Sequence, residues 1–205
     1  MTYNIVNIRG TSGSGKTTVV TRLLEEWKLL GVPLGPAETR VIQGKERRIG
    51  HLAGSLFIVG RYDTTCGGCD TMSWKGAADD VCDLVREKYR FGPVLFEGLM
   101  VSGWGTGRLR SLWEETEQKL HVIQLTTPLE ECLNSVNTRR QEAYARKLRE
   151  KPGVMLPPLK PLNPENTTAK WHGTMRGSEL LKKSGVPVEF LDREAAYQRA
   201  KELLA

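Results

Sequence analysis

The feature that most constrains the fold of this chain is a glycine-rich stretch near its amino terminus. Residues 10–17 read GTSGSGKT and fit the phosphate-binding pattern G-x-x-x-x-G-K-[S/T] at every fixed position. A short β-rich run at 3–9 precedes it, and 18–30 follow with apolar residues at helical spacing. The order strand, glycine loop, helix is the context that this pattern requires. The sequence therefore predicts a nucleoside triphosphate site, although glycine-rich turns also occur in proteins that bind no phosphate.

The residue types in this stretch explain how it would hold phosphate. Glycines let consecutive backbone N–H groups turn inward around an anion, and the start of the helix adds a partial positive charge. We expect Lys16 to contact the β- and γ-phosphates and the Thr17 hydroxyl to take one position on Mg²⁺. The expected nucleotide-binding residues are Gly10, Thr11, Ser12, Gly13, Ser14, Gly15, Lys16, Thr17 and Thr18.

The rest of the chain alternates strand-like and helix-like segments, which predicts an α/β fold. The expected architecture is a three-layer sandwich around a central, mostly parallel sheet, with a β-hairpin insertion at 37–62 after the first helix. Further strands are expected at 94–100, 120–125 and 186–191. Helices are expected at 75–90, 108–119, 129–151, 174–184 and 193–204.

Length and composition predict one soluble domain spanning 1–205. The 205 residues contain no Ser/Gly-rich linker or repeat. No apolar run approaches the roughly 20 residues that a membrane span needs, and the amino terminus does not resemble a signal peptide. We therefore expect a cytoplasmic protein without a membrane partner, whose oligomeric state is open. The four cysteines are too few and too scattered for a disulfide scaffold.

Positive charge is concentrated in the second half of the chain. The net charge is +6, and 139–183 contain eleven Lys or Arg residues against four acids. A solvated helix face together with arginines for phosphate chemistry would explain this, and so would a surface for a polyanion such as nucleic acid.

Two regions supply candidate carboxylates. Glu97 lies in the apolar strand run, near the carboxyl end expected beside the phosphate loop, so we expect it to hold Mg²⁺ with Thr17, directly or through water. An ion-paired surface acid is the alternative for Glu97. In the loop 63–72, Asp70 is the first choice for the general base and Asp63 is the reserve, and Glu97 is also open for that role. Asp70 could instead cap the following helix.

Cys66 and Cys69 form a C-x-x-C pair without further zinc ligands at suitable spacing. Small residues there would let a substrate approach the backbone.

The phosphate loop, written G-x-x-G-x-G-K-T, resembles that of the P-loop nucleoside and nucleotide kinases. No Asn/Thr-Lys-x-Asp guanine-reading motif is present, so a GTPase is not expected. The resemblance implies a lid after the fourth strand, whose arginines contact the transferring phosphoryl group. Arg139, Arg140 and Arg146 match that place, within a lid or substrate segment at about 139–175.

Three further stretches resemble bacteriophage DNA kinases that act on 5-hydroxymethyluracil. They are YDTTCGGCDT at 62–71, VLFEGLMVS at 94–102 and NPENT at 163–167. The resemblance implies that ATP phosphorylates the hydroxymethyl group of a base already within DNA, in the host cytoplasm. Trp74, Trp104 and Trp171 could then stack the extruded base, or pack in the core. A kinase for free nucleosides or nucleotides, and an NTPase without a phosphoacceptor, are the alternatives.

Overall fold

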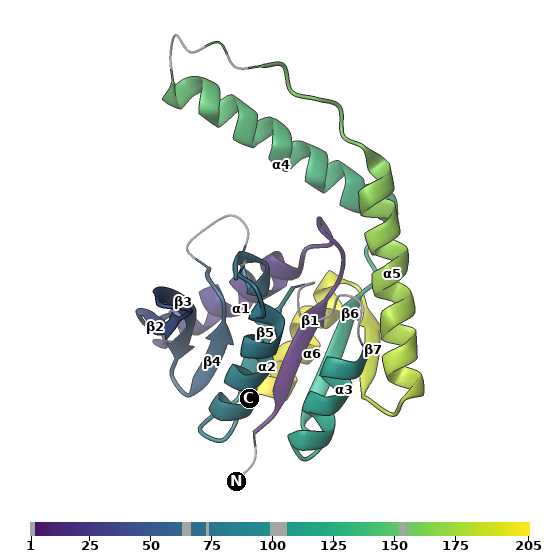
Figure 1. Ribbon diagram of the computed structural model, residues 1–205. Helices are drawn as coiled ribbons and strands as arrows, with labels where there is room; N and C mark the ends of the chain where they lie inside the picture. Colours follow the sequence, from purple (N-terminus) through teal and green to yellow (C-terminus); the bar gives the residue numbers. More distant parts are fainter. Residues whose placement is uncertain (1–2, 63–66, 73, 99–105, 152–154, 156) are drawn as a thin grey trace.

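The computed structural model describes every residue except 1–2, 63–66, 73, 99–105, 152–154 and 156. Among the described residues, seven strands form one sheet in the order β2-β3-β4-β5-β1-β6-β7 (Figure 1). Strands β4, β5, β1, β6 and β7 run parallel, whereas β2 and β3 pair antiparallel at one side. The strands are β1 (Ile5–Arg9), β2 (Ala37–Ile42), β3 (Lys45–Ala53), β4 (Leu56–Val59), β5 (Val94–Glu97), β6 (Leu120–Leu125) and β7 (Val188–Leu191).

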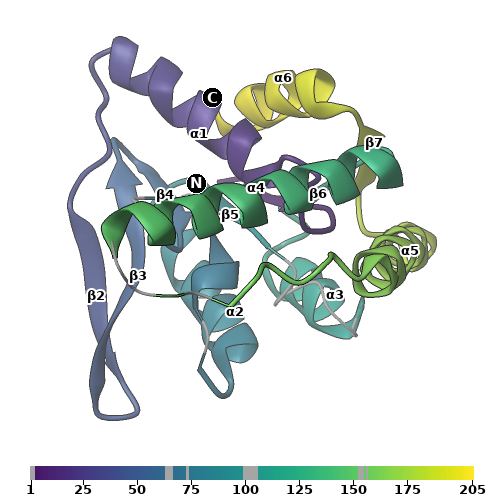
Figure 2. The same ribbon diagram turned by 90° about the horizontal axis from the view of Figure 1, so that it is seen from above.

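Helices cover both faces of the sheet, as the expected three-layer sandwich requires (Figures 1 and 2). Alternation along β1 divides the core, because Ile5 joins one apolar cluster whereas Val6 and Ile8 join the other. The first cluster includes residues of α2, α3 and α5, and the second includes residues of α1 and α6. The helices are α1 (Lys16–Leu29), α2 (Ala77–Lys88), α3 (Thr106–Glu115), α4 (Leu129–Glu150), α5 (Pro164–Lys183) and α6 (Arg193–Leu204), with a short 3₁₀ helix η1 (Cys69–Thr71).

Helix α5 is the element that the sequence pattern described least well. The prediction began it at residue 174, but the helix starts ten residues earlier, at Pro164. Its first half stands beyond the edge of the sheet, so it lacks the apolar periodicity on which the prediction depended (Figure 1). The signal that could have found this start is Asn163, whose side chain accepts a hydrogen bond from the Glu165 backbone N–H at 2.9 Å, followed by proline at the first helical position.

Helix α4 crosses above the carboxyl ends of the strands and is largely exposed (Figures 1 and 2). Every residue of α4 is described, and Cys132, in its second turn, is the only one that is buried. Its other faces carry the basic residues predicted from the sequence. No helix in the described part of the chain has both the length and the apolar character that crossing a bilayer would require.

Candidate active site

The glycine loop between β1 and α1 encloses the side chain of its own lysine. Lys16 is only 7% exposed. Its Nζ donates hydrogen bonds to the carbonyl oxygens of Gly10, at 2.9 Å, and Thr11, at 3.2 Å. A buried ammonium group needs such partners, because losing its water without replacement is costly. The lysine side chain is therefore held at the loop by backbone carbonyl oxygens.

The loop packs tightly against two other parts of the chain. Gly13 has a φ of +84°, and a Cβ at this position would lie 2.3 Å from the carbonyl oxygen of Cys132 in α4. A Cβ at Gly15 would lie 2.6 Å from Nε of Arg193, the first residue of α6. Glycine is required at Gly13 because the α4 backbone already fills the space. At Gly15 the positive φ of +93° is what disfavours other residues, since the Arg193 side chain could move.

Two side chains fix the Ser14 carbonyl within the loop. Thr127 donates to it from Oγ1 at 2.7 Å, and Arg193 donates from Nε at 3.0 Å. Arg193 also pairs with Glu131 at 3.2 Å. Sequence reasoning missed Thr127 and Arg193, because these contacts span more than a hundred residues. Their only signal is that each lies just beyond the carboxyl end of a parallel strand, β6 or β7, where such folds bind ligands.

The predicted pair of Thr17 and Glu97 is brought together. Glu97 is the last residue of β5, is 1% exposed, and lies opposite Ile8 of β1 in the sheet register. Thr17 Oγ1 donates to Glu97 Oε1 at 2.8 Å. A hydroxyl and a carboxylate at one point are the hard oxygen ligands that Mg²⁺ prefers. The residues present therefore fit a magnesium site at the mouth of the loop.

The segment after β4 packs directly against Glu97. A Cβ on Gly68, which has a φ of +72°, would lie 2.5 Å from Glu97 Cγ. A Cβ on Gly60 would lie 2.3 Å from the carbonyl carbon of Gly68. The small residues of this segment thus bring its backbone to the candidate metal site. The sequence analysis expected a substrate to approach this backbone closely, and this expectation stays a prediction.

The candidate bases lie in or beside this segment. Asp70 belongs to η1, two residues after Gly68, so its backbone follows the contact with Glu97. Helix α2 begins seven residues later, at Ala77, with Gly76 at its N-cap, so Asp70 does not cap that helix. Asp63 and Cys66 lie outside the described residues. Cys69 is fully buried in an apolar cluster. The assignment of the base stays a prediction.

The structure does not bring the three lid arginines together at the loop. Arg140 Nη2 donates to the carbonyl of Lys160 at 2.8 Å, and Arg146 lies 3.8 Å from Glu150, with both side chains exposed. Arg139 is half-buried. At about 1.5 Å per residue, Arg140 lies about 12 Å and Arg146 about 21 Å along α4 from Cys132, which touches the loop. A direct role in phosphoryl transfer stays a prediction and requires α4 to approach.

The basic segment that is continuous in sequence is divided in space. Arg139 and Arg146 lie on α4, above the carboxyl edge of the sheet, whereas Lys182 and Lys183 end α5 at the opposite edge (Figure 1). The whole segment therefore cannot form one continuous surface around the loop.

Two of the three candidate tryptophans have structural contacts. Trp74 is half-buried, and its indole N–H donates to Asp80 at 2.7 Å. The indole N–H of Trp171 donates to the Thr127 carbonyl at 2.9 Å, which ties α5 to the support of the glycine loop. Trp104 lies outside the described residues. Stacking on a base stays a prediction for all three.

A buried arginine that sequence reasoning missed lies immediately before the glycine loop. Arg9 ends β1 and is 1% exposed, and a Cβ on Gly177 of α5 would lie 2.7 Å from its Nη2. Burial lowers the pKa of Arg9 to about 10. The guanidinium is still protonated at neutral pH, so it adds a fixed positive charge behind the phosphate-binding loop.

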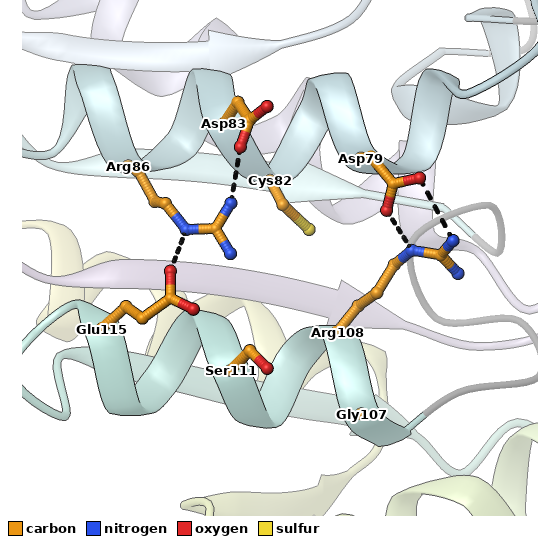
Figure 3. Close-up of a pocket in the computed structure, with 8 residues that line it drawn as sticks. All are labelled: Asp79, Cys82, Asp83, Arg86, Gly107, Arg108, Ser111 and Glu115. Carbon is orange, nitrogen blue, oxygen red and sulfur yellow. Dashed lines mark hydrogen bonds and ion pairs between the residues drawn. The ribbon is translucent and has the colours of Figure 1, made fainter.

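A groove of about 450 Å³ between α2 and α3 is a separate feature (Figure 3). Its described lining residues belong to those two helices, and two ion pairs cross it. Arg108 of α3 pairs with Asp79 of α2 at 2.6 Å, and Arg86 of α2 pairs with Glu115 of α3 and also with Asp83 on its own helix. Burial raises the pKa of the Cys82 thiol to about 11, so the thiol is protonated at neutral pH. These mutual pairs favour a structural role in joining α2 to α3.

Sequence comparisons point to one group of proteins. No protein-family model matches the chain. A protein of Pseudomonas phage PaMx11 described as "5-hmdU DNA kinase" is 39% identical over 201 residues, which cover 98% of this chain and 96% of that protein. A second protein of the same description, from Pseudomonas phage M6, is 29% identical over 141 residues, covering 65% of this chain and 71% of its own length. A third, from Delftia phage PhiW-14, is 39% identical over 71 residues, or 33% of this chain and 22% of that protein.

Proposed function

This chain belongs to the family of phage 5-hmdU DNA kinases, and we propose on that premise that it phosphorylates 5-hydroxymethyluracil within DNA. The observation that carries the proposal is a sequence identity of 39% over nearly the full length of a relative of that name. The family resemblance inferred from the sequence is thereby confirmed. The reaction is transfer of the γ-phosphoryl group of ATP to the hydroxymethyl oxygen of the base.

The glycine loop forms the donor half of the site. Backbone N–H groups of residues 13–17 and the ammonium group of Lys16 bind the triphosphate. Thr127 and Arg193 hold the Ser14 carbonyl, which keeps the loop backbone in the conformation that points its N–H groups at the phosphates. The carbonyls of Gly10 and Thr11 release Lys16 when phosphate oxygens replace them.

Thr17 and Glu97 would hold Mg²⁺, because their oxygens already meet beside the loop. When bound, this ion neutralises charge on the β- and γ-phosphates. The hydrogen bond from Thr17 to Glu97 orients both oxygens before nucleotide arrives.

The second part of the site, the acceptor half, is made up of the Asp70 segment and residues 139–175. It takes up the hydroxyl proton and orients the target nucleobase. The hydroxymethyl oxygen forms a bond to the γ-phosphorus, the bond from that phosphorus to the β–γ bridging oxygen breaks, and ADP leaves. A carboxylate oxygen of Asp70 accepts the hydroxyl proton, with Asp63 as the reserve. The packing of Gly68 against Glu97 sets the position of the Asp70 segment relative to the donor half. Approach of 139–175 as a lid brings Arg139, Arg140 or Arg146 to the migrating phosphoryl group.

The substrate demands additional contacts outside the chemical site. A base inside a duplex is reached only after its nucleotide is extruded, which costs a few kcal/mol. Contacts between basic residues and DNA phosphates offset that cost. We propose that the whole chain acts as one kinase domain, in the host cytoplasm where phage DNA is modified.

The test supplies labelled ATP with hydroxymethyluracil DNA, ordinary DNA and free hydroxymethyldeoxyuridine in parallel. Label should enter only the hydroxymethyluracil DNA efficiently. Higher kcat/KM on the free nucleoside would identify a nucleoside kinase. ATP hydrolysis that no acceptor changes would identify an NTPase. Either result would overturn the proposed function.

A further inference from the structure

The β insertion extends past the sheet that it joins. Strand β3 pairs with β4 from Gly50 to Ala53, and Gly60 N–H, just beyond the end of β4, donates to the Ile49 carbonyl at 2.9 Å. Residues 45–48 continue beyond that point and, in the described structure, pair with β2 alone. Residues 39–48 therefore form a two-stranded ribbon, here called the β2–β3 ribbon, which runs out from the sheet beside α2 (Figure 2).

The β2–β3 ribbon is rich in arginine. Its only acid is Glu46, against Arg40, Lys45, Arg47 and Arg48. Arg40 and Arg47 lie directly opposite each other in the strand register, an arrangement of like charges that is unfavourable for pairing.

Neighbouring groups hold this cluster in place. Arg40 pairs with Glu87 of α2 at 2.6 Å, and the Arg47 guanidinium lies 5.5 Å from the centre of the Trp74 ring. At the tip, the Gln43 side chain donates to the Lys75 carbonyl at 2.8 Å. This contact places Lys75, which is exposed, beside the same cluster.

Protection of sheet edges is one role that these charges can serve. Basic residues on an edge strand discourage pairing with another sheet, and Arg40 on β2 fits that role. Lys45, Arg47 and Arg48 lie where β3 pairs with β2 alone, so they border a second open edge. Four basic residues against one acid within ten residues, with the exposed Lys75 beside them, also form a strongly positive surface that suits a polyanion. Lys45 and Arg48 are exposed, so the apolar core does not require them.

We propose that the β2–β3 ribbon binds the phosphate backbone of duplex DNA flanking the target nucleotide. This inference rests on the proposed function, because it assigns a second contact for the same DNA substrate. A two-stranded ribbon fits the major groove, about 12 Å wide, and guanidinium groups match phosphate geometry.

The sheet geometry gives the site of contact along the DNA. Two strand spacings separate β3 from β5, which ends at Glu97, and this amounts to about 10 Å. Four residue pairs of ribbon extend about 13 Å along the strand direction, at right angles to that spacing, so the far end lies about 16 Å away. At a rise of about 3.4 Å per base pair, the ribbon contacts DNA roughly 3 to 5 base pairs from the target.

The test compares the wild type with K45Q/R47Q/R48Q in binding to an unmodified duplex of about 30 base pairs over a salt series. The slope of log affinity against log salt is negative, and each lost phosphate contact reduces its magnitude by about 0.9, so the magnitude should fall by about 2 to 3 in the variant. The charge-preserving variant K45R/R47K/R48K should retain the slope. The variant K28Q/K183Q, which removes two exposed charges outside the ribbon, should also retain it.

Phosphorylation of a single-stranded trinucleotide containing hydroxymethyluracil separates this inference from the proposed function. The K45Q/R47Q/R48Q variant should keep wild-type activity on the trinucleotide, while its KM for the duplex rises about tenfold or more at fixed salt. An unchanged duplex KM and salt slope would overturn the ribbon inference even if the kinase is fully active. If the variant shows a reduced salt slope but the wild type phosphorylates no hydroxymethyluracil acceptor, the proposed function alone would be overturned. Thermal unfolding checks that the variant is folded.

Discussion

The donor half and the acceptor half of the site are built in different ways. The glycine loop is fixed by the Cys132 carbonyl, by Thr127 and by Arg193, all in direct contact with it. The proposed acceptor side includes α4 and the β2–β3 ribbon, which project beyond the sheet and expose most of their side chains. The comparison suggests that chemistry depends on close backbone packing, whereas a DNA-sized substrate is reached by projecting elements.

The largest effect is expected at Lys16 in the donor half. Lys16→Ala removes the charge that contacts the transferring phosphoryl group, so kcat/KM should fall by about 10³-fold or more while the fold is retained. Steady-state kinetics and thermal unfolding measure the two properties. Lys28→Ala, at the exposed end of α1, is the matched control. Full activity of the Lys16 variant would refute the mechanism.

A somewhat smaller loss is expected for Glu97→Gln. The amide keeps the shape of the side chain but removes its charge beside Thr17, so kcat should fall by about 10²-fold and half-saturation by magnesium should need a higher concentration. Glu25→Gln, at an exposed position on α1, serves as the control. If magnesium dependence were unchanged, Glu97 would not belong to the donor half.

Gly68→Ala tests the junction between the two halves. The added methyl group would lie 2.5 Å from Glu97 Cγ and push the acceptor segment away, so kcat should fall about ten- to a hundredfold. Gly76→Ala is a close match, because its φ of +83° is similar but no atom lies within 4 Å of the new Cβ. That control should lose about 1 kcal/mol of stability and little activity. Equal effects in the two variants would mean that backbone strain, not the contact with Glu97, limits the reaction.

Arg193→Met should have a moderate effect confined to the nucleotide. Loss of the bond to the Ser14 carbonyl loosens the glycine loop, so KM for ATP should rise about fivefold, with KM for DNA unchanged. Initial rates with each substrate varied in turn provide the measurement. A change in the DNA KM instead would assign Arg193 to the acceptor half.

The smallest effect is expected for Arg146→Ala, because this exposed residue lies far along α4 from the loop. Its kcat/KM should stay within about threefold of the wild type. A loss near 10²-fold would show that α4 closes far enough to place Arg146 at the phosphoryl group, and the acceptor half would then be as closely organised as the donor half.

Much of the fold could be predicted because its signals are local. Strand β6 and helix α6 have the predicted limits, and α4 begins at Leu129 as expected, because apolar periodicity and a preceding proline mark them in the sequence. The first half of α5 was missed since it packs little against the sheet. Thr17 and Glu97 meet because parallel strands place their carboxyl ends at one edge, beside the start of α1, and their role in holding Mg²⁺ stays a prediction.

The sequence by itself determined the glycine loop, the parallel α/β sandwich and the kinase family, since each depends on a contiguous motif or on the regular spacing of apolar residues. The tertiary structure alone decided that Arg193 supports the loop, that Gly68 packs on Glu97, and that the basic segment divides between two edges while a ribbon of arginines leaves the sheet elsewhere. These features depend on which distant residues meet across the sheet. Spacing along the chain does not encode such contacts, because strand order and helix direction decide them.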